Sequence, residues 1–464
     1  MEAKRPFSDT DWRKTPEPAK EYIVGLERQV TELTSKVDQL FKRVEELENR
    51  INKNSSNSNK PPSSDLPYKR PKKKAKKSKL KRGARKGHKG NRQAMLEPTE
   101  IIPVLPKDCT CGNTCFDGTA SVSFYTHQHI ELPEIKMNVS HFILHKCTCS
   151  SCGKTLKAAI PKEHRTGYGP RLSALITELS GIHGDSREAV QDFCASVLGF
   201  PISVGAIQNV IDRSSKALDP VYDRIGTLAR ESRVNYIDET SWFQSGKLQW
   251  LWTMVNVAVA FFMVHPNRSK KAFLELIDDW NGILVSDNYG VYVKWMQRQA
   301  CLAHYIRQAK GLAEQKNGKI KKFGKAILKE LRLLCYWAKT PPDEKQWAAF
   351  YTRFIELLTD HEDAQNDAGK LARALIREMI SLWVFLEEKG VEPTNNRAER
   401  ALRFGVIWRK RSKGTQSEKG DRWIERILSL KHTCRMKNLP TFSILVETID
   451  SFFKEREPDL SWLG

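Results

Sequence analysis

Tyr-Ile-Asp-Glu-Thr, residues 236 to 240, ends a short segment whose composition is typical of a β-strand. Two apolar runs within residues 248–264 follow it and predict two adjacent strands. A further apolar run, residues 282–286, ends just before Asp287. The order strand, hairpin, helix, strand predicts that the carboxylates of Asp238 and Asp287 meet at one edge of a single sheet.

A third acid, Glu399, lies in a segment whose pattern predicts a helix. The segment follows Pro393, and Thr394 or Asn395 is expected to cap it. On this helix Asn395, Glu399 and Arg403 share one face. That face offers a carboxylate flanked by an amide and a guanidinium that suits a phosphate.

Three other acids, Glu392, Glu418 and Asp421, lie in the same region. Glu392 precedes a proline, which favours an extended conformation. The other two stand in a segment rich in Gly and Lys, which we expect to be mobile. Glu399 is therefore the preferred third acid, because a helix can hold its carboxylate still.

Four strings in this order carry a resemblance to a known family. They are Asp238-Glu239-Thr240-x-Trp242, Ser286-Asp287-x-Tyr289-x-x-Tyr292, Cys301-x-Ala303-His304 and Asn395-Asn396-x-Ala398-Glu399-Arg400-x-Leu402-Arg403. Together they resemble the transposases of the insertion sequence 66 family, and the resemblance covers nearly all of the chain. It implies a DDE transposase with an RNase H-like catalytic domain, in which Asp238, Asp287 and Glu399 occupy the matching positions.

The length and charge of the chain set limits on its class. Its 464 residues suggest three or four domains, and the fold class that we expect is multidomain α+β. With 77 basic and 55 acidic residues the net charge is +22, which indicates a polyanionic partner such as double-stranded DNA. No apolar run reaches the roughly 18 residues of a membrane span, and the amino terminus has no apolar signal-peptide core. We therefore expect a cytoplasmic protein, in which the ten cysteines are ligands or buried thiols.

Residues 20–52 predict a dimerising coiled coil. One heptad position holds Ile23, Val30, Val37, Val44 and Ile51, and the other holds Leu26, Leu33, Leu40 and Leu47. β-branched residues at the first position and leucine at the second favour a parallel two-stranded coil, hence a homodimer. The alternative is a lone amphipathic helix packed on its own domain, which so narrow a stripe disfavours.

Residues 53–92 predict a disordered basic linker, because they hold too little apolar surface to fold. Residues 69–92 carry 14 Lys or Arg and no acid. Contact with the phosphates of nucleic acid is the preferred interpretation, and a solvated tail is the alternative. The expected phosphate contacts are Lys72, Lys73, Lys74, Lys76, Lys77, Arg82 and Arg85.

Residues 100–160 predict a zinc-binding module. Its two cysteine clusters are Cys109, Cys111 and Cys115, then Cys147, Cys149 and Cys152. The pair Cys149-x-x-Cys152 forms a turn that directs two thiolates at one ion. We expect Cys111, Cys115, Cys149 and Cys152 to bind structural Zn²⁺, while the choice within the first cluster stays open. The family resemblance also places a zinc-finger-like module here, and buried free thiols are the alternative.

Residues 168–220 predict a helix-turn-helix domain with helices over 171–182, 186–198 and 203–218. Its third helix would contact DNA through Gln208, Asn209 and Arg213. A plain helical connector is the alternative.

Residues 230–435 predict the RNase H-like catalytic domain, with a helical insertion over 310–390 and a helical segment over 436–464 beyond it. Helices are expected over 320–338, 344–359 and 369–388. Further DNA contacts are expected from His304, Arg307, Arg400 and Arg403, although His304 could instead be a packing residue.

DNA cleavage and joining require charge neutralisation at phosphorus, which two divalent ions can supply. Three carboxylates are a suitable ligand set for Mg²⁺ or Mn²⁺. We therefore expect Asp238, Asp287 and Glu399 to hold these ions. The alternatives are a metal-dependent RNase H-like nuclease and a non-catalytic DNA-binding regulator derived from a transposase.

Overall fold

The structure is a computed structural model that describes residues 8–58, 60, 65, 94–107, 109–112, 114 and 122–464. Its centre is a five-stranded mixed sheet with the order β5-β4-β3-β6-β7. The strands are β3 (Val234–Gln244), β4 (Lys247–Val255), β5 (Ala260–His265), β6 (Ile283–Ser286) and β7 (Arg298–Ala300). β3, β4 and β5 pair antiparallel, and β6 and β7 continue the sheet in parallel. The α+β class predicted from the sequence is confirmed.

β3 is longer than the sequence predicts, so Asp238 and Glu239 lie within the strand and not at its end. Its pairing with β4 runs on to Gln244 and Lys247. The turn between them places Ser245 at φ 47° and Gly246 at φ 77°. Two left-handed residues in a row suit the twist of a two-residue hairpin.

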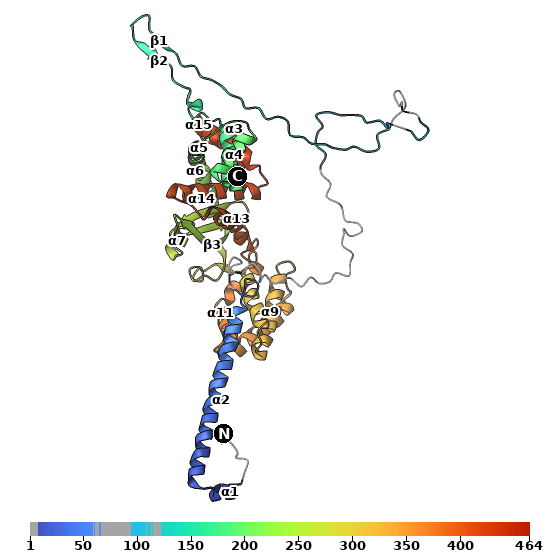
Figure 1. The fold of residues 1–464 in the computed structure, drawn as a ribbon, viewed down its shortest axis with the longest axis vertical. Coiled ribbons are helices and arrows are strands. Elements are labelled where there is room, and N and C mark those ends of the chain that lie inside the picture. Colours follow the sequence, from blue (N-terminus) through green and yellow to red (C-terminus); the bar gives the residue numbers. More distant parts are fainter. Residues whose placement is uncertain are drawn as a thin grey trace.

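The buried apolar residues of this sheet divide between two hydrophobic cores. One contains Ile237, Trp242 and Leu251, and the other contains Tyr236 and Val285. The first core also contains helices that precede and follow the sheet: α3 (Pro170–Thr177), α4 (Arg187–Ser196), α5 (Val204–Ala217), α6 (Asp219–Glu231), α7 (Lys270–Ile277), α13 (Asn396–Ser412), α14 (Glu418–Met436) and α15 (Thr441–Phe453). The region predicted as a helix-turn-helix therefore shares its core with the sheet and with the C-terminal helices (Figure 1).

α14 covers the edge strand β5 through side chains spaced four residues apart. The acceptors are Glu425 Oε1, Ser429 Oγ and Thr433 Oγ1, and the donors are the N–H groups of Val264, Phe262 and Ala260, at 2.7, 3.0 and 3.1 Å. This ladder satisfies donors that an edge strand would otherwise leave unpaired. Burial raises the pKa of Glu425 to about 8.

The second core contains the helices of the insertion, which are α8 (Leu302–Ala313), α9 (Gly318–Tyr336), α10 (Glu344–Glu362), α11 (Asp367–Arg377) and α12 (Val384–Glu387). The sequence predicted one helix over 369–388, which is wrong, because α11 ends at Arg377. The next residue, Glu378, pairs with the buried Arg298 of β7. A 3-10 helix, Met379–Leu382, then leads to α12.

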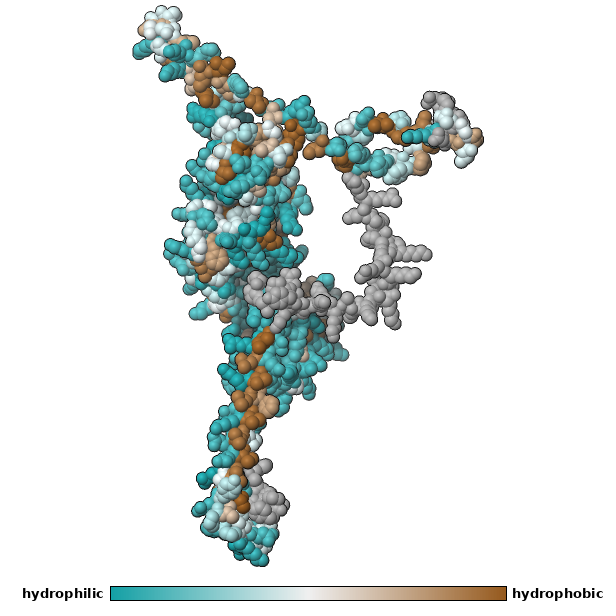
Figure 2. Space-filling model, in the orientation of Figure 1, coloured by the Kyte–Doolittle hydropathy of each residue, from teal (hydrophilic) through white to brown (hydrophobic). Residues whose placement is uncertain are grey.

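α2 (Glu17–Ile51) follows the short α1 (Asp9–Lys14) and projects from the insertion (Figure 1). None of its residues, all of which the structure describes, is buried. Its apolar residues form a continuous stripe along the helix (Figure 2).

A turn after α2 docks on the insertion, whereas the sequence predicted a disordered linker from residue 53. The Asn57 amide donates to Glu314 Oε2 at 2.8 Å, and Asn57 is nearly buried. Its carbonyl oxygen lies so close to Gly311 that a Cβ there would come within 2.2 Å of it. Lys316 also pairs with Glu48 of α2 at 2.6 Å. The end of α2 is therefore fixed to α8 and α9.

Candidate active site

Asp238 and Asp287 occupy matching places on neighbouring parallel strands. The last paired residues of β3 and β6 are Tyr236 and Val285, and each aspartate lies two residues further along its chain. Asp287 comes directly after β6, and its Oδ1 accepts a hydrogen bond of 2.9 Å from the N–H of Tyr289. Both side chains therefore stand at the end of β6.

The pKa of the Asp238 carboxyl is raised well above its ordinary value. Burial is the main cause, and the negative charges of Glu239, Asp287 and Glu399 add to it. Like charges have this effect when they are separated by a few ångströms. Asp238 is therefore close to the three other carboxylates, where a bound cation would offset their mutual repulsion.

Glu239 differs from its neighbour Asp238 because its carboxylate already has partners. Arg268 Nη2 and Nε lie 2.5 and 2.6 Å from Glu239 Oε1, and the Tyr292 hydroxyl donates to Oε2. Burial raises the pKa of Glu239, as does Asp287, whereas Arg268 lowers it. Glu239 thus ties α7 and the segment after β6 to the sheet, and Asp238 remains the acid available to a ligand.

Glu399 lies in the first turn of α13, and Asn395 fixes this turn to the sheet. The sequence predicted that Thr394 or Asn395 would cap the helix. Asn395 is at the N-cap position, but its side chain makes no capping bond, and its amide donates to the carbonyl oxygen of Ile237 at 2.8 Å, directly beside Asp238. Asn395 is fully buried. This bond holds α13 against β3, and Glu399 lies one turn further along the helix.

His304 and Arg307 of α8 face Glu399. Arg307 Nη2 lies 3.5 Å from Glu399 Oε1. The pKa of His304 is lowered by burial and by Arg307, while the charges of Asp287 and Glu399 oppose this shift. Both side chains therefore lie next to the carboxylates.

Ligand atoms of Cys301, His304 and Glu399 all lie within 4.8 Å of one another, the only such group in the described part of the chain. The three acids Asp238, Asp287 and Glu399 do not form such a group. Cys301 directly precedes α8, and the sequence analysis gave it no role.

Comparison with known families identifies the family of the chain. The model of the Transposase IS66 family matches residues 167–422, from α3 into α14. The chain belongs to this family. A second model, of a family of unknown function, matches residues 15–94, which include α2. No curated protein matches the chain.

In this IS66-family chain the region predicted as a helix-turn-helix has the expected helices, but one of its three expected DNA contacts, Gln208, is hydrogen-bonded within the protein. The Gln208 side chain accepts from Arg187 Nε and donates to Asp212 Oδ1, each at 2.8 Å. Arg213 is partly buried, and burial lowers its pKa. Asn209 is exposed.

A cavity of about 760 Å³ lies between this region and the helices α13 and α14. Its lining includes Arg187, Trp408, Arg411, Lys419 and the backbone of Gly414. It therefore presents cationic side chains from both parts of the fold. Arg400 and Arg403, which the sequence also assigned to DNA, are exposed on α13.

The described cysteines of the transposase's predicted zinc module lie in a long extended part of the chain that ends in the hairpin of β1 (Lys146–Thr148) and β2 (Thr155–Lys157) (Figure 1). Cys149 and Cys152 lie in its turn, where hydrogen bonds from residues 151 and 152 lower the pKa of the Cys149 thiol. Among the described cysteines, Cys111 does not join this pair in one group. Cys115 lies outside the described residues, so the four-cysteine site stays a prediction.

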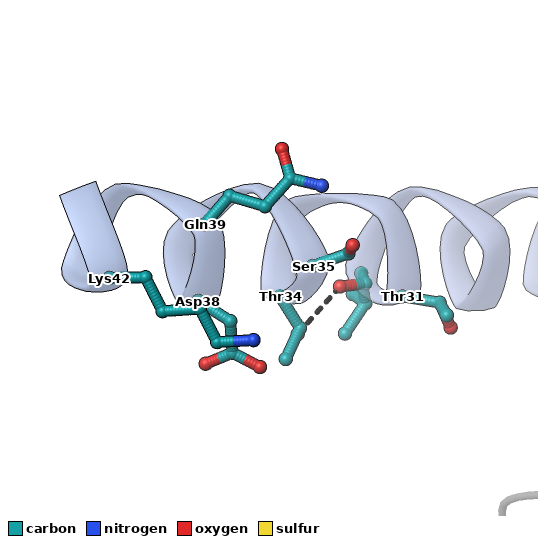
Figure 3. Close-up of a pocket in the computed structure, with 7 residues that line it drawn as sticks. Thr31, Thr34, Ser35, Asp38, Gln39 and Lys42 are labelled. Carbon is teal, nitrogen blue, oxygen red and sulfur yellow. Dashed lines mark hydrogen bonds between the residues drawn. The ribbon is translucent and has the colours of Figure 1, made fainter. Parts of the chain in front are cut away.

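The basic segment from Lys72 to Arg85, with Lys73, Lys74, Lys76, Lys77 and Arg82, also lies outside the described residues. A hollow on α2 is lined by that helix alone, on its polar side (Figure 3). Its polar lining residues include Ser35, Asp38 and Gln39, which lie outside the heptad stripe, and Val30 of the stripe borders it. None of the helices in the described ranges is both long and apolar enough to cross a membrane.

Proposed function

We propose that the protein binds the ends of an insertion sequence and catalyses metal-dependent cleavage and joining of DNA strands. The observation that carries the proposal is the convergence of Asp238, Asp287 and Glu399 from β3, the end of β6 and α13. Membership in the IS66 transposase family supports it.

The donor set fits Mg²⁺ or Mn²⁺. Carboxylate oxygens are hard ligands of the kind that these ions prefer. The raised pKa of Asp238 indicates a concentration of negative charge that a cation would relieve. When bound, two such ions supply activation of the attacking oxygen and stabilisation of the leaving oxygen.

The chain's own residues position the DNA around these carboxylates. Arg307 and His304 are placed beside Glu399, where a scissile phosphate would need a donor. Asn395 keeps the Glu399 turn against β3, because its amide is bound to Ile237. Arg400 and Arg403, exposed on α13, would contact the DNA backbone next to the site.

Other parts of the chain would supply affinity and assembly. Residues 69–92 would contact phosphates without regard to sequence. Asn209 on α5 would take part in recognition of the ends. The cysteine module would bind structural Zn²⁺, and α2 would form a parallel homodimer.

The proposal is tested with the full chain, a labelled insertion-sequence end and Mg²⁺. Glu399→Gln, Asp238→Asn and Asp287→Asn should each reduce cleavage by several orders of magnitude while DNA binding survives, because the amide keeps the shape but loses the charge. Glu418→Gln is the matched control, since Glu418 is exposed in the first turn of α14. Cleavage by the Glu399→Gln protein at the wild-type rate would remove Glu399 from the site.

The products distinguish the remaining functions. Joining of the freed 3′ end to target DNA is expected of a transposase. Cleavage without joining would indicate a nuclease, and binding without cleavage would indicate a regulator.

A further inference from the structure

Cys301, His304 and Glu399 converge from two elements that the backbone locks together. Cys301 is the residue before α8, and His304 lies within the first turn of that helix. Glu399 comes from the first turn of α13. The N–H of Leu302 donates to the carbonyl oxygen of Pro393 at 2.9 Å, which joins the starts of the two helices.

The three ligand atoms, a sulfur, an imidazole nitrogen and a carboxylate oxygen, lie within 4.8 Å of one another. Around a tetrahedral zinc ion, with metal–ligand bonds of about 2.0–2.3 Å, ligand atoms lie about 3.3–3.8 Å apart. Small side-chain rotations are therefore enough to close the group on an ion. The fourth position would remain open on the side of His304 and Glu399, which are only partly buried.

The kinds of ligand set this group apart from the three catalytic acids. Sulfur and imidazole favour Zn²⁺ and similar ions, whereas Mg²⁺ prefers oxygen alone. The His304 Nδ1 atom is buried and has no hydrogen-bond partner within the described chain. An unpartnered buried nitrogen is costly, and a metal ion is one way to satisfy the ring.

The backbone also prepares Cys301 for such a role. The N–H of Asn395 points at the Cys301 sulfur, 3.1 Å away. This donor lowers the pKa of the Cys301 thiol, although burial raises it to about 12, so binding of a metal ion would displace a proton that the free thiol holds.

We propose that Cys301, His304 and Glu399 form a site for Zn²⁺ or a similar thiophilic ion, which takes Glu399 from the catalytic magnesium and so switches off cleavage reversibly. The inhibitory consequence rests on the proposed function. The metal site itself does not, because its ligands can be observed without DNA.

Co²⁺ is the probe for the site, since a cobalt–thiolate bond gives a charge-transfer absorption in the near ultraviolet. Full-length protein stripped with a chelator is titrated with Co²⁺, using Cys149→Ser, Cys152→Ser as the common background to remove the other predicted thiolate site. This background should still show the band. Adding Cys301→Ser should abolish it, while adding Cys335→Ser, a change to a partly buried cysteine of α9, should leave it intact.

His304→Gln is a second variant that tests the site even if the Cys301→Ser protein fails to fold. It keeps the thiol, so its cobalt affinity should fall by at least the about 10–100-fold that loss of an outer-shell partner costs. Equal bands in the background protein and in its Cys301→Ser form, with equal cobalt affinity of the His304→Gln form, would overturn the site.

To test the switch, the rate of DNA cleavage is measured with and without Zn²⁺ at a fixed Mg²⁺ concentration. The ratio of the two rates is then compared between the wild type and each variant. In Cys301→Ser the Zn²⁺ concentration that halves cleavage should rise by about tenfold or more. An unchanged concentration would overturn the switch. A protein that shows the Cys301-dependent band but never cleaves DNA would keep the metal site and contradict the proposed function.

Discussion

Asp238 is less stable as an anion than an exposed aspartate, because burial and three neighbouring carboxylates raise its pKa. An unfolded aspartate titrates near pH 3.9, at about the ordinary value. Between that value and the raised folded pKa, the unfolded state has released a proton that the folded state still holds. The free energy of unfolding of the metal-free protein therefore falls as pH rises through this window.

Asp238→Asn should remove that penalty. In chelator at pH 7 we expect a melting temperature above that of the wild type by about 2–4 °C, the shift that about 1 kcal/mol gives in domains of 150–250 residues. The difference should narrow as the pH falls towards about 4. Differential scanning calorimetry makes the measurement, with Asp360→Asn, an exposed acid of α10, as the control. A melting temperature at or below that of the wild type would show that the Asp238 carboxylate is not destabilising.

Sequence motifs could identify the acid pair Asp238 and Glu239. They could not show that Asp238 is available to a ligand whereas Glu239 is bound by other side chains. This difference depends on Arg268 and Tyr292, which lie far along the chain and bind Glu239. The polar residues of α5 show the same limit. The sequence predicted that Gln208 would contact DNA. Its side-chain amide is instead hydrogen-bonded to Arg187 of α4 and to Asp212, one turn further along α5.

At the scale of elements, the hydrogen bonds between α14 and β5 fix the five-stranded sheet to the C-terminal helices. Each acceptor on α14 satisfies one N–H of an edge strand. Removing such an acceptor leaves a buried donor unpaired, at a cost of about 1–3 kcal/mol.

Thr433→Val keeps the shape of the side chain and removes the acceptor for Ala260. Hydrogen exchange of a peptide covering β5 should become faster by about 5- to 150-fold, which corresponds to about 1–3 kcal/mol. Thr359→Val is the control, since the hydroxyl of Thr359 bonds only to carbonyls of its own helix, α10, among the described residues. Equal exchange of β5 in the two variants would mean that the ladder does not stabilise the edge.

The periodic spacing of apolar residues predicted most of the helices. It did not predict the residues at which tertiary contacts end them. The pattern over 369–388 is continuous, and the break after α11 exists because Glu378 turns to meet Arg298 of β7. Likewise, the extra length of β3 comes from its hairpin with β4, which no apolar count reveals. The pattern that predicted a helix-turn-helix could be recognised within one short stretch of sequence. The core that this region shares with α14 and α15 could not, because those helices lie far along the chain.

At the scale of the whole molecule, α2 is a long helix attached to the insertion at its C-terminal end only, within the described residues. Its C-terminal turn docks on α8 through Asn57, and α8 carries His304 and Arg307 at its other end. The low apolar content of residues 53–65 predicted a disordered linker there. Docking was missed because it uses an asparagine amide and a close backbone approach, which leave no hydrophobic signal.

The exposed stripe of α2 is where we expect a second copy of the chain to bind. Leu33 and Leu40 are 59 % and 64 % exposed at consecutive leucine positions of the heptad. Burying them in a parallel coil recovers apolar area that a lone helix leaves in water. Because each coil strand ends on its own insertion, a parallel pair would place two active sites at the same end of the coil.

Leu33→Asp with Leu40→Asp would bring charges into that seam, which is strongly unfavourable. Light scattering should then give a mass near 53.2 kDa for the variant and twice this for the wild type. The matched control is Ser35→Asp with Gln39→Asp, which adds the same charge to the same helix within the polar hollow of Figure 3. This control should remain a dimer, because its new charges face solvent. If the leucine variant also stays dimeric, the protomers meet elsewhere, and α2 would serve only as an arm fixed to the insertion.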